Sequence, residues 1–176
     1  MASDVTIKGA KELFAFLNQL PVNVEKNIMR SALRAGASVI AKQAKANVPV
    51  KMGGLKASIR TGSNVRKGGA EAYVRAGGRK NKANSKDNSA FYANFVEFGT
   101  AAHMIYPATK KKLKFKAKDG STRFANFVLH KGAQARPFMR PAYDAKSEEA
   151  ILAVTKRIRQ RLTKQGISVP APEDND

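Results

Sequence analysis

The sequence of 176 residues predicts one α+β domain, in which two long helices pack on a small, mostly antiparallel sheet with a protruding β-hairpin. Three observations predict this class: two long stretches have apolar residues at helical spacing, short segments between them alternate in polarity, and Asp119-Gly120 marks a tight turn. We expect the domain to cover residues 1–165 and residues 166–176 to form an extended acidic tail. A chain of this length can bury a sizeable core, so it needs no disulfide, and it contains no cysteine.

The first 50 residues are predicted to be mainly helical. Residues 9–20 have the pattern of a short amphipathic helix, and Pro21 ends that helix or starts the next element. Residues 22–47 form the clearest helix, because apolar residues recur at intervals of three and four while Lys and Arg line the opposite face. Pro49 disfavours helical geometry at the preceding residue, so this helix should end near Asn47.

Short elements and a loop are predicted next. Two consecutive glycines break the helical pattern, and residues 55–60 then alternate in polarity, which favours a strand, although a helical turn at 55–58 also fits. Residues 71–76 alternate as well and predict a second strand. Residues 78–90 are polar and rich in Lys and Asn, which indicates an exposed basic loop.

Residues 90–98 are predicted to form a short helix that ends at Gly99. Its aromatic side chains are Phe91, Tyr92, Phe95 and Phe98. Large aromatic rings usually supply buried area, so we expect these four to lie in the core under the sheet.

A β-hairpin and a second long helix complete the prediction. Residues 111–117 and 122–129 flank the Asp-Gly turn and form the hairpin, within a lysine-rich segment at 108–130. Prolines bracket the start of the last helix, at about residues 141–163. Its acidic residues come early and its basic residues late, which is the order that the helix dipole favours.

The chain is strongly basic, with 33 Lys and Arg against 13 Asp and Glu and a formal net charge of +20. Three of the acids, Glu173, Asp174 and Asp176, lie in the last four residues. So basic a chain repels itself and favours a polyanion or an acidic protein surface as partner. The apolar runs are too short to span a membrane, and the first residues show no signal peptide, so we expect no membrane contact.

The sequence offers no pattern that predicts catalysis, a cofactor or a bound metal. The glycine and histidine signatures of hydrolases, nucleotide-binding loops and zinc proteases are missing. Neither His103 nor His130 has a second ligand at metal-binding spacing, so both are expected to be ordinary histidines. Glu97 is the only acid embedded in an apolar stretch, and we favour a carboxylate paired with a cation over a catalytic group. We therefore expect a protein that is not an enzyme.

Two clusters of cations are the candidate contact sites for DNA or a protein partner. They comprise Arg79, Lys80, Lys82, Lys86, Lys110, Lys111, Lys112, Lys114, Lys116 and Lys118. On a hairpin, Lys112, Lys114 and Lys116 would share one face and form a cationic ribbon suited to phosphates. The alternative is a solvated face, since lysines also protect exposed strand edges. No motif that reads base sequence is found, so any contact with nucleic acid is expected to be with its backbone.

Three sequence blocks occur in an order that resembles a known family. They are residues 48–59 (VPVKMGGLKASI), 91–100 (FYANFVEFGT) and 135–142 (ARPFMRPA). The set is similar to the neck, or tail-completion, proteins of long-tailed bacteriophages, a head–tail joining family related to the minor tail protein Z of lambdoid phages. The resemblance covers about residues 10–160.

This resemblance implies a structural virion protein that assembles in the host cytoplasm and resides in the phage neck. It implies a homo-oligomeric ring, typically sixfold, at the head-proximal end of the tail. The ring would join the tail terminator or tail tube protein to the head connector or stopper protein, and genomic DNA would pass through it. Arg136, Arg140 and Glu97 are the candidate residues of the subunit interface, because arginine makes bidentate contacts with acids. The charge alone favours an alternative, a sequence-independent nucleic-acid-binding architectural protein.

Overall fold

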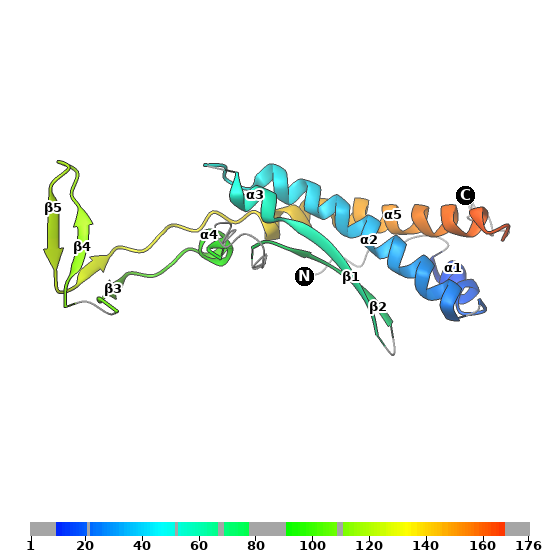
Figure 1. Ribbon diagram of the computed structural model, residues 1–176. Helices are drawn as coiled ribbons and strands as arrows, with labels where there is room; N and C mark the ends of the chain where they lie inside the picture. Colours follow the sequence, from blue (N-terminus) through cyan, green and yellow to red (C-terminus); the bar gives the residue numbers. More distant parts are fainter. Residues whose placement is uncertain are drawn as a thin grey trace. The chain divides into compact units, whose positions relative to one another are not determined.

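The computed structural model describes residues 10–20, 22–51, 53–66, 69–77, 91–108 and 111–167 (Figure 1). The elements in chain order are α1 (Ala10–Leu17), α2 (Val22–Asn47), α3 (Gly54–Ser58), β1 (Arg60–Arg66), β2 (Gly69–Arg75), α4 (Ala93–Phe98), β3 (His103–Ile105), β4 (Leu113–Lys116), β5 (Thr122–Ala125), β6 (Val128–His130) and α5 (Met139–Lys164). The predicted α+β class, with two long helices, antiparallel strands and a hairpin, is confirmed.

The chain divides into two compact units. One comprises Met1–Phe91 and Phe138–Asp176, and we call it the helical unit. The other comprises Tyr92–Pro137, and we call it the ribbon unit. The predicted basic loop at 78–90 and residues 168–176 of the predicted tail lie outside the described residues.

The helical unit is built on α2 and α5, which pack against each other in antiparallel directions (Figure 1). The helix α2 ends at Asn47, as Pro49 predicts. Gly36 lies where the two helices approach closely: a Cβ there would be 2.7 Å from Cγ2 of Val154 and 2.8 Å from the carbonyl oxygen of Ala150. The absence of a side chain at this position therefore sets the distance between the helices.

The main apolar cluster lies where α1 packs on the two long helices. Its buried members are Leu13, Leu17, Ile28, Ala32, Ile158 and Leu162. Burial of each large aliphatic side chain contributes about 1.5–3 kcal/mol to folding before the entropy cost is subtracted. The apolar face that the sequence predicts for residues 22–47 is therefore the face that meets α5.

The segment between α2 and β1 corrects one sequence prediction. Residues 55–60 were expected to form a strand, but residues 54–58 form α3, the helical turn that the sequence also allowed. Gly53 begins the turn with a φ of 78°, a conformation that glycine adopts without strain. Leu55 and Ser58 then share one buried face. The Ser58 hydroxyl donates to the carbonyl of Leu55 (2.7 Å) and accepts from the backbone N–H of Gly77 (2.9 Å).

The strands form three separate two-stranded antiparallel sheets. In the helical unit, β1 pairs with β2 and the hairpin lies against α2. In the ribbon unit, β3 pairs with β6, and β4 pairs with β5 through a turn in which Gly120 has a φ of 78°. The hairpin predicted around Asp119-Gly120 is therefore confirmed.

A backbone bridge closes the base of the ribbon unit. Thr100 and Ala133 exchange two backbone hydrogen bonds, of 2.9 and 3.1 Å. Gly99 precedes the bridge with a φ of 71°, and a Cβ there would be 2.6 Å from the carbonyl oxygen of Ala133. Glycine suits this position for two reasons: it adopts the left-handed backbone without strain, and it has no side chain to block the close approach of the two chain segments.

The prediction that the aromatic residues around α4 are buried is wrong. The exposed fractions are 69% for Phe91, 38% for Tyr92, 51% for Phe95 and 78% for Phe98. The helix is only six residues long, and its buried side chains are Ala93 and Glu97. Phe95 and Phe98 therefore lie on the more exposed faces of α4, opposite its buried residues.

Candidate functional site

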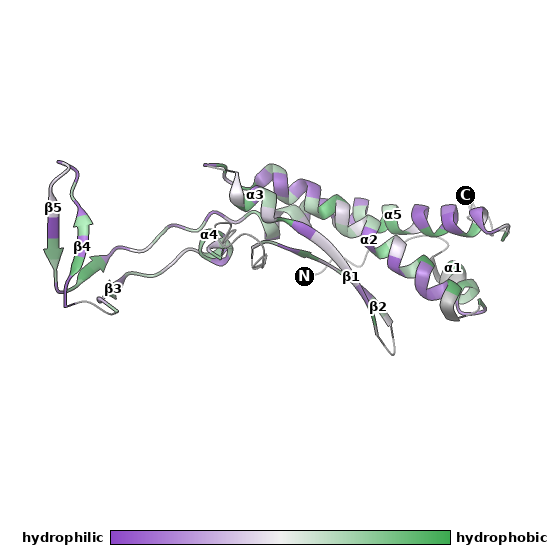
Figure 2. Cartoon of the chain, in the orientation of Figure 1, coloured by the Kyte–Doolittle hydropathy of each residue, from purple (hydrophilic) through white to green (hydrophobic). Residues whose placement is uncertain are grey.

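The ribbon unit exposes a large apolar surface. Its members, which we call the apolar ribbon surface, are Tyr92, Phe95, Phe98, Met104, Ile105, Tyr106, Phe115, Phe124, Phe127 and Leu129. Among the described residues, these ten account for most of the large apolar side chains that are exposed, while the only buried apolar residue of this unit is Ala93. Figure 2 shows hydrophobic residues beside hydrophilic ones on β5 and β6. So many exposed apolar side chains within one unit favour contact with a partner.

Each face of the β4–β5 hairpin carries at least one cation and a phenylalanine. Lys114 lies opposite Phe124, and Lys116 lies opposite Thr122, so both lysines share one face; Lys112, the third lysine of the predicted ribbon, precedes β4. The other face carries Phe115 opposite Arg123. The exposed residues Lys111, Lys112 and Lys118 flank β4. The remaining candidate cations, Arg79, Lys80, Lys82, Lys86 and Lys110, lie outside the described residues.

The tip of this hairpin is held by Asp119. Its carboxylate accepts hydrogen bonds from the Ser121 hydroxyl (2.6 Å) and the Ser121 backbone N–H (2.9 Å), and it pairs with Arg123 (3.2 Å). These hydrogen bonds, chiefly those from Ser121, lower the pKa of Asp119 below its ordinary value. The carboxylate is fully exposed, so the effect is confined to the local order of the turn.

The three candidate interface residues lie in different environments. Glu97 is buried on α4. Arg136 is exposed, and its backbone N–H donates to the carbonyl of Val96 (2.7 Å). Arg140 lies on the first turn of α5 and forms an ion pair with Asp144 one turn later (3.3 Å). Arg140 thus has an acidic partner within its own helix.

The two histidines are neighbours in space, which the sequence analysis missed. His103 and His130 are cross-strand partners in the β3–β6 pair, with ring centroids 5.0 Å apart. Two residues separate β5 from β6, whereas a longer segment separates β3 from β4, so the register of the β4–β5 hairpin does not predict this pair. Within the described ranges, no group of three or more His, Asp and Glu residues could hold a metal ion. No described helix is long and apolar enough to cross a membrane.

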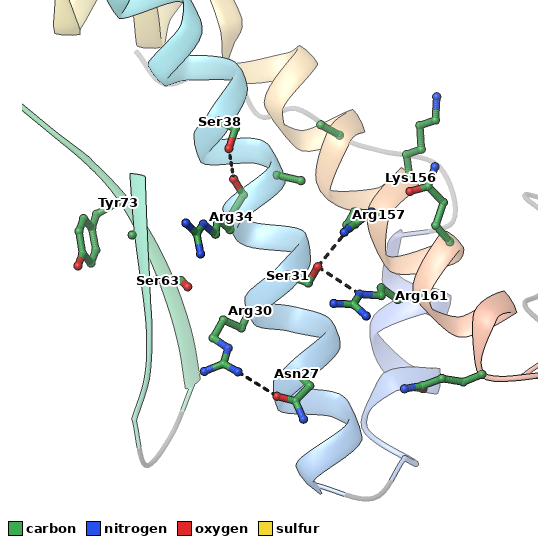
Figure 3. Close-up of a pocket in the computed structure, with 15 residues that line it drawn as sticks. Asn27, Arg30, Ser31, Arg34, Ser38, Ser63, Tyr73, Lys156, Arg157 and Arg161 are labelled. Carbon is green, nitrogen blue, oxygen red and sulfur yellow. Dashed lines mark hydrogen bonds between the residues drawn. The ribbon is translucent and has the colours of Figure 1, made fainter. Parts of the chain in front are cut away.

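A second candidate surface is a cationic groove in the helical unit, which we call the arginine groove (Figure 3). It has a volume of about 1120 Å³ and lies between α2, α5 and the β1–β2 hairpin. Its cations are Arg30 and Arg34 from α2 and Lys156, Arg157 and Arg161 from α5. No acidic residue lies in the lining that the structure describes.

Ser31 connects the two helices at the edge of the groove. Its hydroxyl oxygen accepts hydrogen bonds from Nε of Arg157 (3.1 Å) and Nε of Arg161 (3.3 Å). Figure 3 shows these two side chains extending from α5 toward Ser31 and Arg34 extending from α2 toward the hairpin. The sequence analysis placed the cations of residues 22–47 opposite the apolar face and those of the last helix late in that helix, and it predicted no shared site. The only local signal of a shared site was their spacing of four residues on each helix.

The two surfaces are suited to contacts with other macromolecules. Comparison with known proteins agrees: residues 11–99 match the HK97-gp10-like family, which is described as "Bacteriophage HK97-gp10, putative tail-component". The match covers half of the chain, and the chain belongs to this family of phage tail components. The protein is accordingly a structural component of the virion that interacts with other virion proteins. No curated protein and no solved structure matches the chain significantly.

Proposed function

We propose that this tail component belongs to the phage neck and is related to the minor tail protein Z of lambdoid phages. In this proposal it forms a homo-oligomeric ring, typically sixfold, at the head-proximal end of the tail. The ring joins the tail terminator or tail tube protein to the head connector or stopper protein, and genomic DNA passes through it. Assembly takes place in the host cytoplasm. The membership in a tail-component family supports this proposal.

The observation that carries the proposal is the apolar ribbon surface. A two-stranded ribbon alone is marginally stable in water, and these ribbons bury almost no apolar side chains of their own. Covering exposed apolar area contributes about 25 cal/mol per Å² to association. The outer edges of β4 and β5 are also free of strand partners among the described residues, so a neighbouring chain can extend this sheet at either edge.

A second copy of the chain is the proposed occupant of this surface. A closed ring repeats one head-to-tail interface, in which a patch on each subunit contacts a different patch on the next, so one kind of contact suffices for the whole assembly. Arg136, Arg140 and Glu97 remain the proposed polar residues of the subunit interface. The hairpin lysines, with the cations of residues 78–90, are proposed to contact the channel DNA or an acidic neighbouring ring.

Electron microscopy of particles from a phage that lacks this gene tests the joining role. We expect filled heads beside complete but unattached tails, and we expect a plasmid copy of the gene to restore joined virions. Joined virions in the absence of the gene would overturn the proposal. Negative-stain images of the unattached tails give the second readout, because a joining ring made of this protein should be missing from their head-proximal end.

The second candidate function is a sequence-independent nucleic-acid-binding architectural protein. The net charge of +20 and the arginine groove favour it. The two functions differ in the phenotype of the deletion, since an architectural protein would leave the joining of heads and tails intact. They also differ in oligomeric state, because the architectural role requires only a monomer.

A further inference from the structure

We infer that the arginine groove binds the phosphates of a nucleic-acid backbone, without regard to base sequence. The site lies wholly in the helical unit and differs from the hairpin lysines to which the sequence analysis assigned such contacts. It goes beyond the proposed neck function, because the groove is complete in one chain and needs no ring.

The charge of the groove favours a bound anion. Arg30 and Arg34 are one helical turn apart on α2, and Arg157 and Arg161 are one turn apart on α5. Like charges at this spacing repel each other on a helix. No ion pair of these four arginines with an acid is recorded in the described part of the chain. A bound anion would therefore reduce the repulsion between the arginines of each pair.

The hydrogen bonds of Ser31 orient two of the guanidinium groups. Because Arg157 and Arg161 donate to Ser31 through Nε, the planes of both groups are held against α2. No hydrogen bond from their terminal nitrogens is recorded among the described residues. A planar guanidinium with two terminal donors matches two phosphate oxygens, which is why arginine is favoured in phosphate recognition.

The rest of the lining favours nucleic acid over an acidic protein. Protein interfaces have an apolar or aromatic centre, whereas interfaces with nucleic acid are more polar and far more positive. The apolar part of this groove consists of Ala35, Ala153 and the ring of Tyr73, and the remaining neutral residues are mostly polar. The site has no extended apolar strip that a protein segment could fill. It presents cations from two helices and no element aimed at base edges, which is the chemistry of backbone contact.

The binding of the full-length chain to a fluorescent 20-base-pair duplex of random sequence, measured across salt concentrations, tests the inference. Two groove variants are compared with the wild type, Arg30→Gln with Arg34→Gln and Arg157→Gln with Arg161→Gln. Each neutralised phosphate contributes about 0.9 to the slope of log K against log salt, so each pair should lower that slope by about 2. We expect at least a tenfold loss of affinity at about 0.1 M salt for each pair. Arg30 and Arg34 lie on an exposed face of α2. Circular dichroism verifies that their replacement leaves the fold intact.

A control on the same helix separates the groove from net charge. Lys42→Gln with Lys45→Gln also removes two charges from α2, but both lysines are exposed and neither lines the groove. We expect this pair to change affinity less than threefold. Equal losses for the control and groove pairs would overturn the inference, as would a wild type that does not bind the duplex.

Binding of poly-glutamate with the same total charge as the duplex tests the other class of partner, an acidic protein segment. If it binds more tightly than the duplex and loses affinity in the groove variants, the groove takes an acidic protein segment and the inference fails. None of these outcomes alters the deletion phenotype that tests the neck proposal. The inference about the groove and the neck proposal can therefore fail separately.

Discussion

Gly36 on α2 and Ala150 on α5 lie so close that a Cβ at residue 36 would be 2.8 Å from the carbonyl oxygen of residue 150. The obstacle is backbone, which cannot turn away as a flexible side chain can. The packing of the two long helices, and with it the arginine groove between them, therefore depends on the absence of a side chain at this one position.

Replacing Gly36 with Val should destabilise the helical unit by about 1–3 kcal/mol, because an inserted side chain forces the helices apart. Urea unfolding followed by circular dichroism measures the change. The control is Lys42→Val, which places the same side chain on an exposed position of α2 and should cost only the propensity difference, about 0.7 kcal/mol or less. Equal costs for the two variants would mean that the close contact at Gly36 does not determine the packing.

The same substitution should cost very different amounts of folding free energy at two phenylalanines in different units. Phe138 is 1% exposed, so Phe138→Ala should cost about 3–5 kcal/mol of folding free energy. Phe95 is 51% exposed, so Phe95→Ala should cost less than about 1 kcal/mol and should instead reduce incorporation of the protein into virions. Thermal unfolding of the purified chain gives the first quantity, and immunoblotting of purified particles gives the second. Full incorporation of Phe95→Ala would count against the apolar ribbon surface as a subunit contact.

The lysines of the hairpin should contribute to contacts and not to folding. The set to be replaced by Gln is Lys110, Lys111, Lys112, Lys114 and Lys116. We expect an unchanged unfolding transition but weaker joining of heads and tails or weaker retention of DNA, because exposed lysines contribute little to stability. Plaque assays and electron microscopy measure the loss.

A matched control for the hairpin uses cations of the helical unit. Five lysines, Lys26, Lys42, Lys45, Lys51 and Lys56, are exposed and lie outside the hairpin and the groove. Their replacement by Gln should leave infectivity close to that of the wild type. Unchanged infectivity of the variant with five hairpin lysines replaced would refute the proposed role of the hairpin.

The turn of the hairpin should lose order in acid. The pKa of Asp119 is lowered from 3.8 by hydrogen bonds from Ser121 and by Arg123, so the ionised form is favoured when the turn is folded. Its stabilising effect is therefore present above about pH 3.8 and is lost as the pH falls through the lower pKa of the folded turn. The amide resonance of Ser121 should report this loss by NMR. In Asp119→Asn the resonance should show no titration in this range, and a titration that persists would implicate another group.

The long helices and the hairpin could be predicted from the sequence because their signals are local. Apolar spacing along residues 22–47 defines a helix wherever that segment lies, and Pro49 ends the helix through a clash with its own neighbour. The Asp119-Gly120 turn is equally local, since glycine alone allows the left-handed backbone at this site without strain. At residues 55–60 local signals conflicted, and the buried hydrogen bonds of Ser58 decided for a helical turn.

The candidate surfaces depend on which faces of the helices and strands pack together. No short segment of the sequence shows this. The spacing of Phe91, Phe95 and Phe98 indicates a helix face, but whether such a face is core or contact surface depends on what covers it. In the same way, Arg30 and Arg157 are solvated charges on two separate helices until antiparallel packing brings them to one groove. The sequence by itself determined the class of fold, the basic character, and the places of the two long helices and of the hairpin at Asp119-Gly120. Only the tertiary structure decided which apolar side chains are buried and which cations act together, because burial and electrostatic coupling depend on distances between segments far apart in the chain.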